Sequence, residues 1–377
     1  MSGEAPEGWT IGPMVQFFEL QRGHDLPLQN RGAGGVPVIA SNGIVGWHNH
    51  SHLSGPGVVT GRSGTIGKVN YIEGPYWPLN TTLYVRDFKG SEPEFVYRFL
   101  EHFPLAAFQS GTGVPTLNRN DIHPIDVAFP PLDEQRRIAD VLRSVDEAIA
   151  VGQDVAEQAQ TVWHGLTERL LWDRLSTSPD AARQLGHVLR GTDYGVNAPL
   201  GNEPTGYAVL RMGNLQDGWI CPTDLKWGEI DDAEAQALAL DVGDILFNRT
   251  NSRDLVGKVA LVREPTDFLY ASYIVRLRVN QSVVDPYYLF AVMHSRRAQS
   301  QFKSIATPGV SQSNINPTNL KRQVIPLPPL AEQREIAAQL QSVEAARRAA
   351  LDELTRLRQT KSDLMSDLIS GRVRVAA

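Results

Sequence analysis

The chain has little of what marks several large classes of protein. It holds one cysteine, Cys221, among 377 residues, so neither a disulfide framework nor a cysteine-rich metal site is expected. Its apolar runs are a few residues long, far below the roughly 20 that span a bilayer. No N-terminal segment combines a basic start with an apolar core. We therefore expect a cytoplasmic protein without a membrane segment, and its length and 42% hydrophobic content allow two globular domains.

Excess charge of either sign is also small. The net charge of −6 argues mildly against a protein that coats nucleic acid by bulk attraction. The charge is nevertheless uneven. Residues 249–303 hold nine Lys and Arg against four Asp and Glu, whereas residues 133–173 hold four against nine. Basic and acidic surfaces are therefore expected on different parts of the molecule.

Recognisable catalytic motifs are missing. Gly67-Lys68 resembles the end of a phosphate-binding loop, but Arg62 and Val69 stand where that motif needs Gly and Ser or Thr. Residues 128–131 lack the leading amide or acid of an adenine methyltransferase motif, and residues 285–287 contain only one proline. There is no glycine-rich cofactor fingerprint and no nuclease-like carboxylate cluster. We expect no catalytic residue in this chain.

Three histidines alternate in the segment Trp47-His48-Asn49-His50-Ser51-His52, which would place them on one face of a strand. Alternating histidines can bind a metal ion, but no carboxylate or cysteine stands beside them. A solvated loop or a loop that faces DNA is the favoured interpretation, and no metal site is predicted.

An internal repeat is the most informative feature of the sequence. The segment that begins Pro130-Pro131-Leu132 recurs 198 residues later at Pro328-Pro329-Leu330, and 11 of 16 positions are identical between residues 130–145 and 328–343. The offset is about half the chain length, which indicates duplication of the whole protein. Each half would consist of a globular segment followed by a long helix.

Both predicted helices carry a 4-3 pattern of apolar positions. Ten such positions run from Ile138 to Leu170, and the equivalent ten run from Ile336 to Leu368, with Arg347 and Lys361 as interruptions. This pattern favours an antiparallel coiled coil between the two helices over two unrelated amphipathic helices. The candidate seam and partner-docking residues are Leu142, Val145, Ile149, Trp163, Leu340, Val343, Leu354 and Leu357.

The Pro-Pro pairs exclude upstream extension of these helices, and Gly371 predicts the end of the second. Arg347 and Lys361 either fix the register or face another subunit. The predicted fold class is mixed α/β (α+β), with two duplicated globular domains and two long helices in a pseudo-twofold arrangement. Residues 36–43 and 206–214 are predicted as equivalent strands that run into turns.

Two loops that combine Arg, Lys, Gly and small polar residues occupy equivalent places in the halves. They are residues 58–69 and 245–259, and a second shared anchor aligns residues 113–118 with 309–316. Arginine can grip guanine or phosphate with two hydrogen bonds, and glycine permits close approach. The alternative is a polar turn with Arg62 and Arg249 in structural ion pairs. The candidate DNA-binding residues are Arg62, Ser63, Thr65, Lys68, Asn118, Arg249, Thr250, Asn251, Arg253, Lys258, Gln312 and Asn314.

These features together resemble the specificity (S) subunit of type I restriction–modification systems. The resemblance is carried by the two Pro-Pro-Leu-x-Glu-Gln-Arg helix starts, residues 240–246, the two Gly-Lys-Val loops and Gln312-Ser313-Asn314-Ile315. It covers nearly the whole chain in its domain order. It implies target recognition domains at residues 1–129 and 176–327, and conserved spacer helices at residues 130–175 and 328–377. The first half departs from the family pattern at residues 55–59, where Gly-Pro-Gly-Val-Val replaces the second half's Val-Gly-Asp-Ile-Leu.

The resemblance implies a non-catalytic subunit of a restriction and adenine methyltransferase complex. Each recognition domain would read one half of an asymmetric, bipartite site in double-stranded DNA. The helices would set the gap and dock two modification (methyltransferase) subunits, and restriction (translocase/endonuclease) subunits would join them. S-adenosylmethionine, ATP and magnesium would belong to those partners, and no cofactor is expected in this chain.

Two alternatives stay open at this point. One is the recognition subunit of a methyltransferase-only or type II-like complex, which neighbouring genes would distinguish. The other is a coiled-coil scaffold whose globular halves bind proteins or small ligands. The scaffold predicts no DNA binding even with partners present, and no effect of substituting Arg62 or Arg249.

Overall fold

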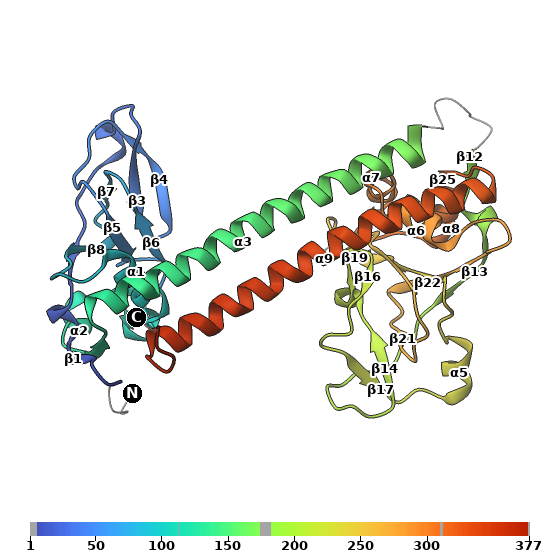
Figure 1. Ribbon diagram of the computed structural model, residues 1–377. Coiled ribbons are helices and arrows are strands. Elements are labelled where there is room, and N and C mark those ends of the chain that lie inside the picture. Colours follow the sequence, from blue (N-terminus) through green and yellow to red (C-terminus); the bar gives the residue numbers. More distant parts are fainter. Residues whose placement is uncertain (1–5, 112, 174–181, 310–311, 376–377) are drawn as a thin grey trace. The chain divides into compact units, whose positions relative to one another are not determined.

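The chain forms two compact units in a computed structural model that describes residues 6–111, 113–173, 182–309 and 312–375 (Figure 1). The first unit comprises residues 1–153 and 352–377, and the second comprises residues 154–351. Two long helices, α3 (Leu132–Thr167) and α9 (Leu330–Ile369), each contribute one part to either unit. We describe the units separately.

The first unit is built on a four-stranded antiparallel sheet in the order β2-β8-β5-β6. β5 is central and all five of its residues are buried, which suits its run of small and β-branched side chains. α1 packs against this sheet. The bounds are β2 (Glu19–Arg22), β5 (Gly57–Gly61), β6 (Val69–Ile72), β8 (Thr82–Asp87) and α1 (Pro93–His102).

Smaller elements complete the first unit. A three-stranded sheet has the order β4-β3-β7, with β3 and β7 parallel, and two further pairs are β1-β11 and β9-β10. The bounds are β1 (Thr10–Pro13), β3 (Val36–Ala40), β4 (Gly43–His48), β7 (Trp77–Pro78), β9 (Gln109–Ser110), β10 (Thr116–Leu117), β11 (Asp126–Phe129), α2 (Arg119–Ile122), and the 3-10 turns η1 (Met14–Gln16), η2 (Leu28–Asn30) and η3 (Leu105–Phe108).

The second unit repeats this order, so the predicted duplication and the mixed helix and strand architecture are confirmed. Its main sheet has the order β13-β22-β18-β20, and its smaller sheet has the order β17-β14-β21 with β14 and β21 parallel. The bounds are β12 (Ala182–Gln184), β13 (Leu189–Tyr194), β14 (Tyr207–Leu210), β17 (Lys226–Gly228), β18 (Ile245–Asn248), β20 (Val259–Leu261), β21 (Leu269–Tyr270), β22 (Ile274–Val279), β25 (Val324–Pro326), α6 (Pro286–His294) and α8 (Pro317–Lys321).

β3 and β14, the strands predicted at residues 36–43 and 206–214, occupy equivalent central places in the two small sheets. The second unit carries further elements in its loops. They are β15 (Leu215–Gln216), β16 (Trp219–Ile220), β19 (Thr250–Asn251), β23 (Thr307–Pro308), β24 (Ser313–Asn314), α5 (Asp232–Ala237), α7 (Arg296–Ser304), η6 (Leu185–Val188) and η7 (Met212–Asn214). The π-helical turn η4 (Glu168–Trp172) directly continues α3.

The glutamines of the repeated segment explain why it opens both long helices. Gln135 and Gln333 are buried and make the same pair of hydrogen bonds. Each side-chain oxygen accepts from the backbone N–H before the first proline of α1 or α6, and each side-chain nitrogen donates to the first carbonyl of its own Pro-Pro pair. The partners are Glu92 (2.8 Å) and Pro130 (2.9 Å) for Gln135, and Asp285 (2.9 Å) and Pro328 (2.7 Å) for Gln333.

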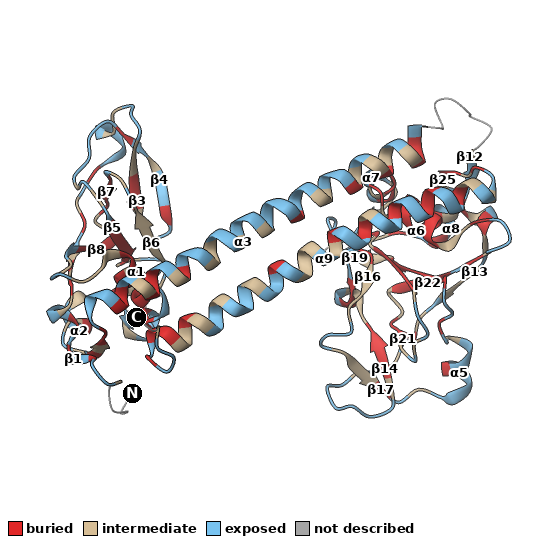
Figure 2. Ribbon diagram, viewed as in Figure 1, coloured by how far each residue is buried: buried red, intermediate tan, exposed pale blue. Residues whose placement is uncertain are grey.

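The two long helices run antiparallel within each unit. In the first unit, Asp146 of α3 pairs with Lys361 of α9 at 2.9 Å. In the second, Gln160 accepts a 2.6 Å hydrogen bond from Arg347. Gln160 follows Asp146 by 14 residues on α3, and Arg347 precedes Lys361 by 14 residues on α9. Both contacts therefore fit the same antiparallel register. All twenty seam positions are buried or half-buried, and Gly371 follows α9 with a φ of +70°. Figure 2 shows buried and half-buried stretches alternating with exposed ones along both helices.

In each unit, seam residues belong to the hydrophobic core of the globular part. In the first unit, Ile138, Leu142 and Leu368 belong to the same buried cluster as Phe99 and Phe129 of the globular part. In the second, the cluster that contains Trp172, Ile336 and Leu340 extends into β18, β22 and α6. Each globular half is therefore packed directly on helix ends. Among the helices of the described ranges, none is long and apolar enough to cross a membrane.

Both cations that interrupt the seam have partners within their own unit. Lys361 pairs with Asp146 and lies 3.7 Å from Glu101 of α1. Arg347 is 2% exposed and pairs with Asp217 in the turn between β15 and β16. Lys361 and Arg347 therefore each form an ion pair that joins α9 to the globular part of its own unit.

Candidate nucleic-acid interface

Arg62 is held in place by backbone hydrogen bonds on both sides. It directly follows the buried strand β5. Its N–H donates to the carbonyl of Thr81 at 2.8 Å, and its own carbonyl accepts from the N–H of Leu117 at 2.8 Å. The loop that carries Arg62 is thus joined both to the turn before β8 and to the end of β10.

Arg249 has the same framework in the second unit. It follows β18, its N–H donates to the carbonyl of Tyr273 at 3.1 Å, and its carbonyl accepts from the N–H of Ile315 at 2.8 Å. The two predicted loops are therefore equivalent in three dimensions as well as in sequence. What differs is the set of side chains around each arginine.

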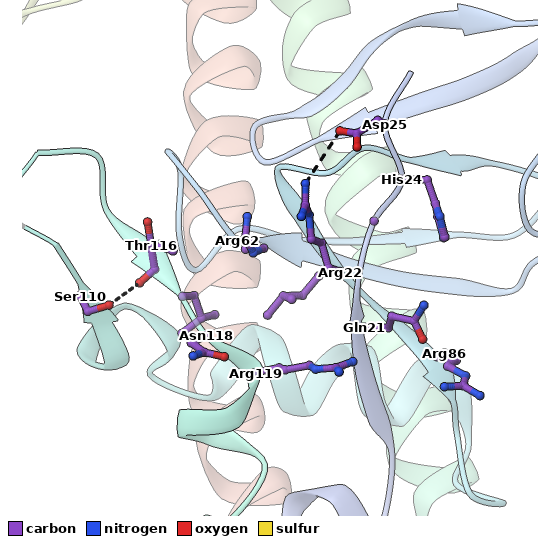
Figure 3. Close-up of a pocket in the computed structure, with 13 residues that line it drawn as sticks. Gln21, Arg22, His24, Asp25, Arg62, Arg86, Ser110, Thr116, Asn118 and Arg119 are labelled. Carbon is purple, nitrogen blue, oxygen red and sulfur yellow. Dashed lines mark hydrogen bonds and ion pairs between the residues drawn. The ribbon is translucent and has the colours of Figure 1, made fainter. Parts of the chain in front are cut away.

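Around Arg62 lies a hollow of about 740 Å³ that is rich in arginine (Figure 3). Among the residues that line this hollow, Asp25 is the only one with a carboxylate, and its Oδ1 lies 3.8 Å from Nη2 of Arg22. Arg119 donates to the carbonyl of Leu20 at 3.2 Å. The hydrogen-bonding side chains that line the hollow are Gln21, Arg22, His24, Asp25, Arg62, Arg86, Ser110, Thr116, Asn118 and Arg119.

The charge of this hollow suits an anionic ligand. Arg86 is offset by Glu19 at 3.7 Å and Arg22 by Asp25, and both arginine side chains are more than half exposed. Within the described part of the chain, the Arg62 guanidinium makes no side-chain hydrogen bond or ion pair. A cluster of arginines with unused donors, next to hydroxyl and amide groups, is suited to phosphate and base edges.

The other candidates of the first unit lie in different environments. Ser63 is in backbone contact with Thr116, and Thr65 is exposed. Lys68 donates through Nζ to the carbonyl of Asn42 at 2.6 Å, at the turn between β3 and β4. Lys68 does not line the arginine-rich hollow.

Asn118 lines the hollow but also has a structural task. Its side-chain oxygen accepts from the N–H of Asn120 and caps α2, and Asn316 caps α8 in the same way through the N–H of Thr318. The structural counterpart of Asn118 is therefore Asn316, whereas Asn314 corresponds to Thr116.

Arg249 is fixed by its neighbours, unlike Arg62. Its Nη2 donates to Oδ1 of Asn314 at 2.9 Å, and its guanidinium carbon lies 5.0 Å from the ring centroid of Tyr194. Thr250 and Asn251 form β19, which pairs with β24, and Asn251 is 9% exposed and accepts from the N–H of Ser252. Arg249, Thr250, Asn251 and Asn314 are thus brought together.

Three candidates of the second unit lie away from this group. Arg253 and Gln312 are exposed, and the carbonyl of Gln312 accepts from the N–H of Gly309. Lys258 lines a separate hollow of about 340 Å³ that includes Asp217 and His294. Lys258 therefore stands beside the ion pair that joins the β15-β16 turn to α9.

The sequence does not predict Arg22 or Tyr194 as site residues, although Arg22 lines the hollow of Arg62 and Tyr194 contacts Arg249. Strand register shows that Arg22 and Tyr194 are equivalent. Each lies opposite a residue of the neighbouring strand, and that residue in turn lies opposite the residue two positions before the loop arginine. Arg22 pairs with Leu83 and this with Thr60, and Tyr194 pairs with Val275 and this with Phe247. No local motif marks them, because only the strand pairing brings them to the loop.

The segment of residues 240–246 has a structural role in the second unit. Asp244 is buried and accepts hydrogen bonds from Nε of Arg276 at 2.6 Å and from the N–H of Asp241 at 2.9 Å. Gly243 adopts a φ of +97°, which favours glycine. The segment closes a turn before β18 and neutralises the buried arginine of β22.

The alternating histidines form an aromatic cluster. His48 accepts from the N–H of Gly32 at 3.0 Å, and the ring centroids of His52 and His24 lie 3.6 Å apart with their planes tilted by 33°. Burial, and then the neighbouring His52, lower the pKa of His24. No group of three potential metal-binding side chains occurs in the parts of the chain that the structure describes.

Comparison with known proteins agrees with this architecture. The family model described as type I restriction modification DNA specificity domain matches residues 6–160 and 197–356, which is one copy in each half. The chain belongs to this family. The two matches also explain why the units repeat the same order of strands and helices.

Individual members of this specificity family are similar over different lengths. A putative type I restriction enzyme MjaX specificity subunit of Methanocaldococcus jannaschii is 33% identical over 195 residues, which cover 51% of this chain and 45% of that protein. The type I restriction enzyme EcoKI specificity subunit of Escherichia coli K12 is 24% identical, over 91% of this chain and 84% of that protein. The S subunit structure from M. genitalium has the same fold, with a TM-score of 0.65, 14% identity and 96% coverage of both chains.

Proposed function

We propose that this chain is the non-catalytic DNA specificity subunit of a type I restriction–modification complex, and that each globular half reads one half of an asymmetric, bipartite site. One observation carries the proposal. The same pair of backbone hydrogen bonds holds each loop arginine, but the side chains around it differ: Arg22 and Thr116 line the hollow of Arg62, whereas Tyr194 and Asn314 contact Arg249. A duplicated frame with divergent contact residues is suited to two different half-sites.

The long helices are proposed to set the gap between half-sites and to dock two modification subunits. We retain recognition domains at residues 1–129 and 176–327, with spacer helices at 130–175 and 328–377. S-adenosylmethionine, ATP and magnesium are assigned to the modification and restriction subunits. The acidic net charge supports a division of labour in which those subunits make much of the phosphate contact.

We place the docking surface outside the seam. The predicted seam and docking residues Leu142, Val145, Ile149, Trp163, Leu340, Val343, Leu354 and Leu357 are buried or half-buried along the face where α3 and α9 meet. On the outer face of α3 in the second unit, Val155 is 50% exposed and Val162 is 52% exposed. These valines are two turns apart on one face, as contacts for a partner helix would be.

Substitution of the exposed valines tests this docking surface. We expect Val155→Asp and Val162→Asp to reduce the amount of modification subunit that co-purifies with the chain, because each places a charge in an apolar contact. Thr161→Asp, on another face of the same helix, is the matched control. Equal complex mass for all three variants, measured by light scattering, would show that this face does not dock the subunits.

The function itself is tested by sequencing the methylome of the host with the gene intact and deleted. We expect loss of adenine methylation at one split, asymmetric motif. Loss of methylation without loss of restriction against unmodified DNA would favour a methyltransferase-only complex. An unchanged methylome, with modification subunits present and active on another motif, would favour the scaffold and overturn the proposal.

A further inference from the structure

The guanidinium of Arg249 is organised before any ligand arrives. Asn314 accepts a hydrogen bond from Nη2 at 2.9 Å, and the Tyr194 ring lies 5.0 Å from the guanidinium carbon. Tyr194 remains 51% exposed, so this stacked pair lies at the surface. An arginine held by a hydrogen bond and an aromatic ring loses less freedom on binding than a mobile one.

The donors left on Arg249 point to one kind of acceptor. Its Nε is buried without a partner in the described structure, so the Nη1 group and the second N–H of Nη2 are the donors that can reach a ligand. No carboxylate in the described ranges forms an ion pair with Arg249. A fixed arginine that offers two adjacent N–H groups matches the O6 and N7 acceptors of guanine in the major groove.

The equivalent arginine of the first unit lacks these supports. Arg22 stands where the second unit has Tyr194, and Thr116 stands where it has Asn314. At these two positions Arg62 therefore has neither an aromatic ring nor an amide, and it shares its hollow with Arg22 and Arg119 (Figure 3). Several neighbouring arginines suit the delocalised charge of phosphates.

We infer that Arg249 reads a guanine in the half-site of the second globular half, with Asn314 and Tyr194 as positioning residues, and that Arg62 holds a backbone phosphate. This assignment rests on the proposed function and deepens it. It predicts that substitutions at two equivalent arginines have different consequences: Arg249 controls which base is accepted, and Arg62 controls how tightly any DNA is held.

The experiment uses the chain assembled with its modification subunits and duplexes that contain the methylated motif. Each guanine of the motif is replaced in turn by 7-deazaguanine, which lacks N7. We expect wild-type binding to weaken about tenfold at one guanine. Complexes that carry Arg249→Ala or Arg249→Lys should bind the duplex without 7-deazaguanine about tenfold more weakly than the wild type does. Their affinity should no longer change when that one guanine is replaced. Asn314→Ala and Tyr194→Leu should reduce the response to the same guanine.

Arg62→Ala is the matched comparison. It should weaken binding to the motif and to unrelated DNA by the same factor, and reduce the slope of log affinity against log salt by about one. Thermal unfolding of each variant checks that the fold is retained. The assignment is overturned if Arg249→Ala stays as sensitive to every replacement as the wild type, or if neither strand of the half-site read by the second globular half contains guanine.

Failure of the proposed function would look different. In that case the wild-type complex would bind the methylated motif no better than unrelated DNA, before any substitution is made. Selective binding by the wild type together with a uniform loss for Arg249→Ala would overturn only the guanine assignment.

Discussion

Arg347 occupies a position of the α9 seam that an apolar side chain would normally fill, and replacing it tests how the second globular half is fastened. Its side chain is 2% exposed and pairs with Asp217, and it donates to Gln160 of α3. Burial opposes the charged form of Asp217, but the contacts with His294 and Arg347 lower its pKa overall. Arg347→Met keeps an apolar side chain of similar length, while Asp217 and Gln160 each lose the group that donates to them.

The expected cost follows from the exposure of the partner left behind. Breaking a fully buried ion pair costs about 3–5 kcal/mol. Asp217 is 43% exposed in its side chain, so water recovers part of the lost interaction. We expect Arg347→Met to destabilise the attachment of the β15-β16 turn by about 2 kcal/mol, which is roughly a 30-fold change in its opening equilibrium. Arg347→Met combined with Asp217→Asn should cost under about 1 kcal/mol.

Amide hydrogen exchange measured by mass spectrometry gives the readout. Peptides that cover residues 215–220 should lose protection by about 30-fold in Arg347→Met and little in the double variant, while peptides from α1 serve as an internal reference. Lys361→Met is the matched control, because Arg98 still neutralises Asp146 and Glu101 when Lys361 is gone. Equal loss of protection in the single and double variants would refute the ion pair as the cause.

Two further predictions concern buried polar groups. Gln333→Ala should lower the free energy of unfolding by about 2 kcal/mol in urea titrations, because it leaves the partly buried N–H of Asp285 and the buried carbonyl of Pro328 unpaired. Exposed Arg334→Ala is the control, and equal shifts would count against the idea. Burial, and then the charge of Arg296, lower the pKa of His164 to about 4 from 6.5. As the pH falls, the unfolded chain therefore takes up a proton on His164 at a higher pH than the folded chain does. The free energy of unfolding should fall between about pH 6.5 and pH 4, by about 1–2 kcal/mol after screening. His164→Gln should remove that part of the pH dependence, and an unaltered stability profile would contradict it.

The large features of the fold were predictable from local sequence. The Pro-Pro pairs and Gly371 act on the backbone within a few residues, so they mark where α3 and α9 begin and where α9 ends. The 4-3 pattern identified the buried face of both helices for the same reason. The chemical task of Gln135 and Gln333 was not visible, because their partners at Glu92 and Asp285 are more than 40 residues away.

The candidate site was predictable only in part. The repeated strand and glycine pattern predicts the loops of Arg62 and Arg249. The candidates include Asn118 and Asn314 but not Asn316, which is the structural counterpart of Asn118. Arg347 left two alternatives open from the sequence. Its partner at Asp217 is 130 residues distant, in a turn that no pattern connects with the helix.

The sequence by itself determined the duplication, the two long helices, the seam and the family, because repeats, helix periodicity and proline and glycine chemistry operate over short stretches of chain. Only the tertiary structure decided which polar groups meet. Strand pairing sets Tyr194 beside Arg249 and Arg22 at the equivalent position in the other half, and a hydrogen bond that spans 65 residues fixes Arg249 on Asn314. Such contacts depend on the directions and distances of side chains from separate elements, which no local pattern encodes.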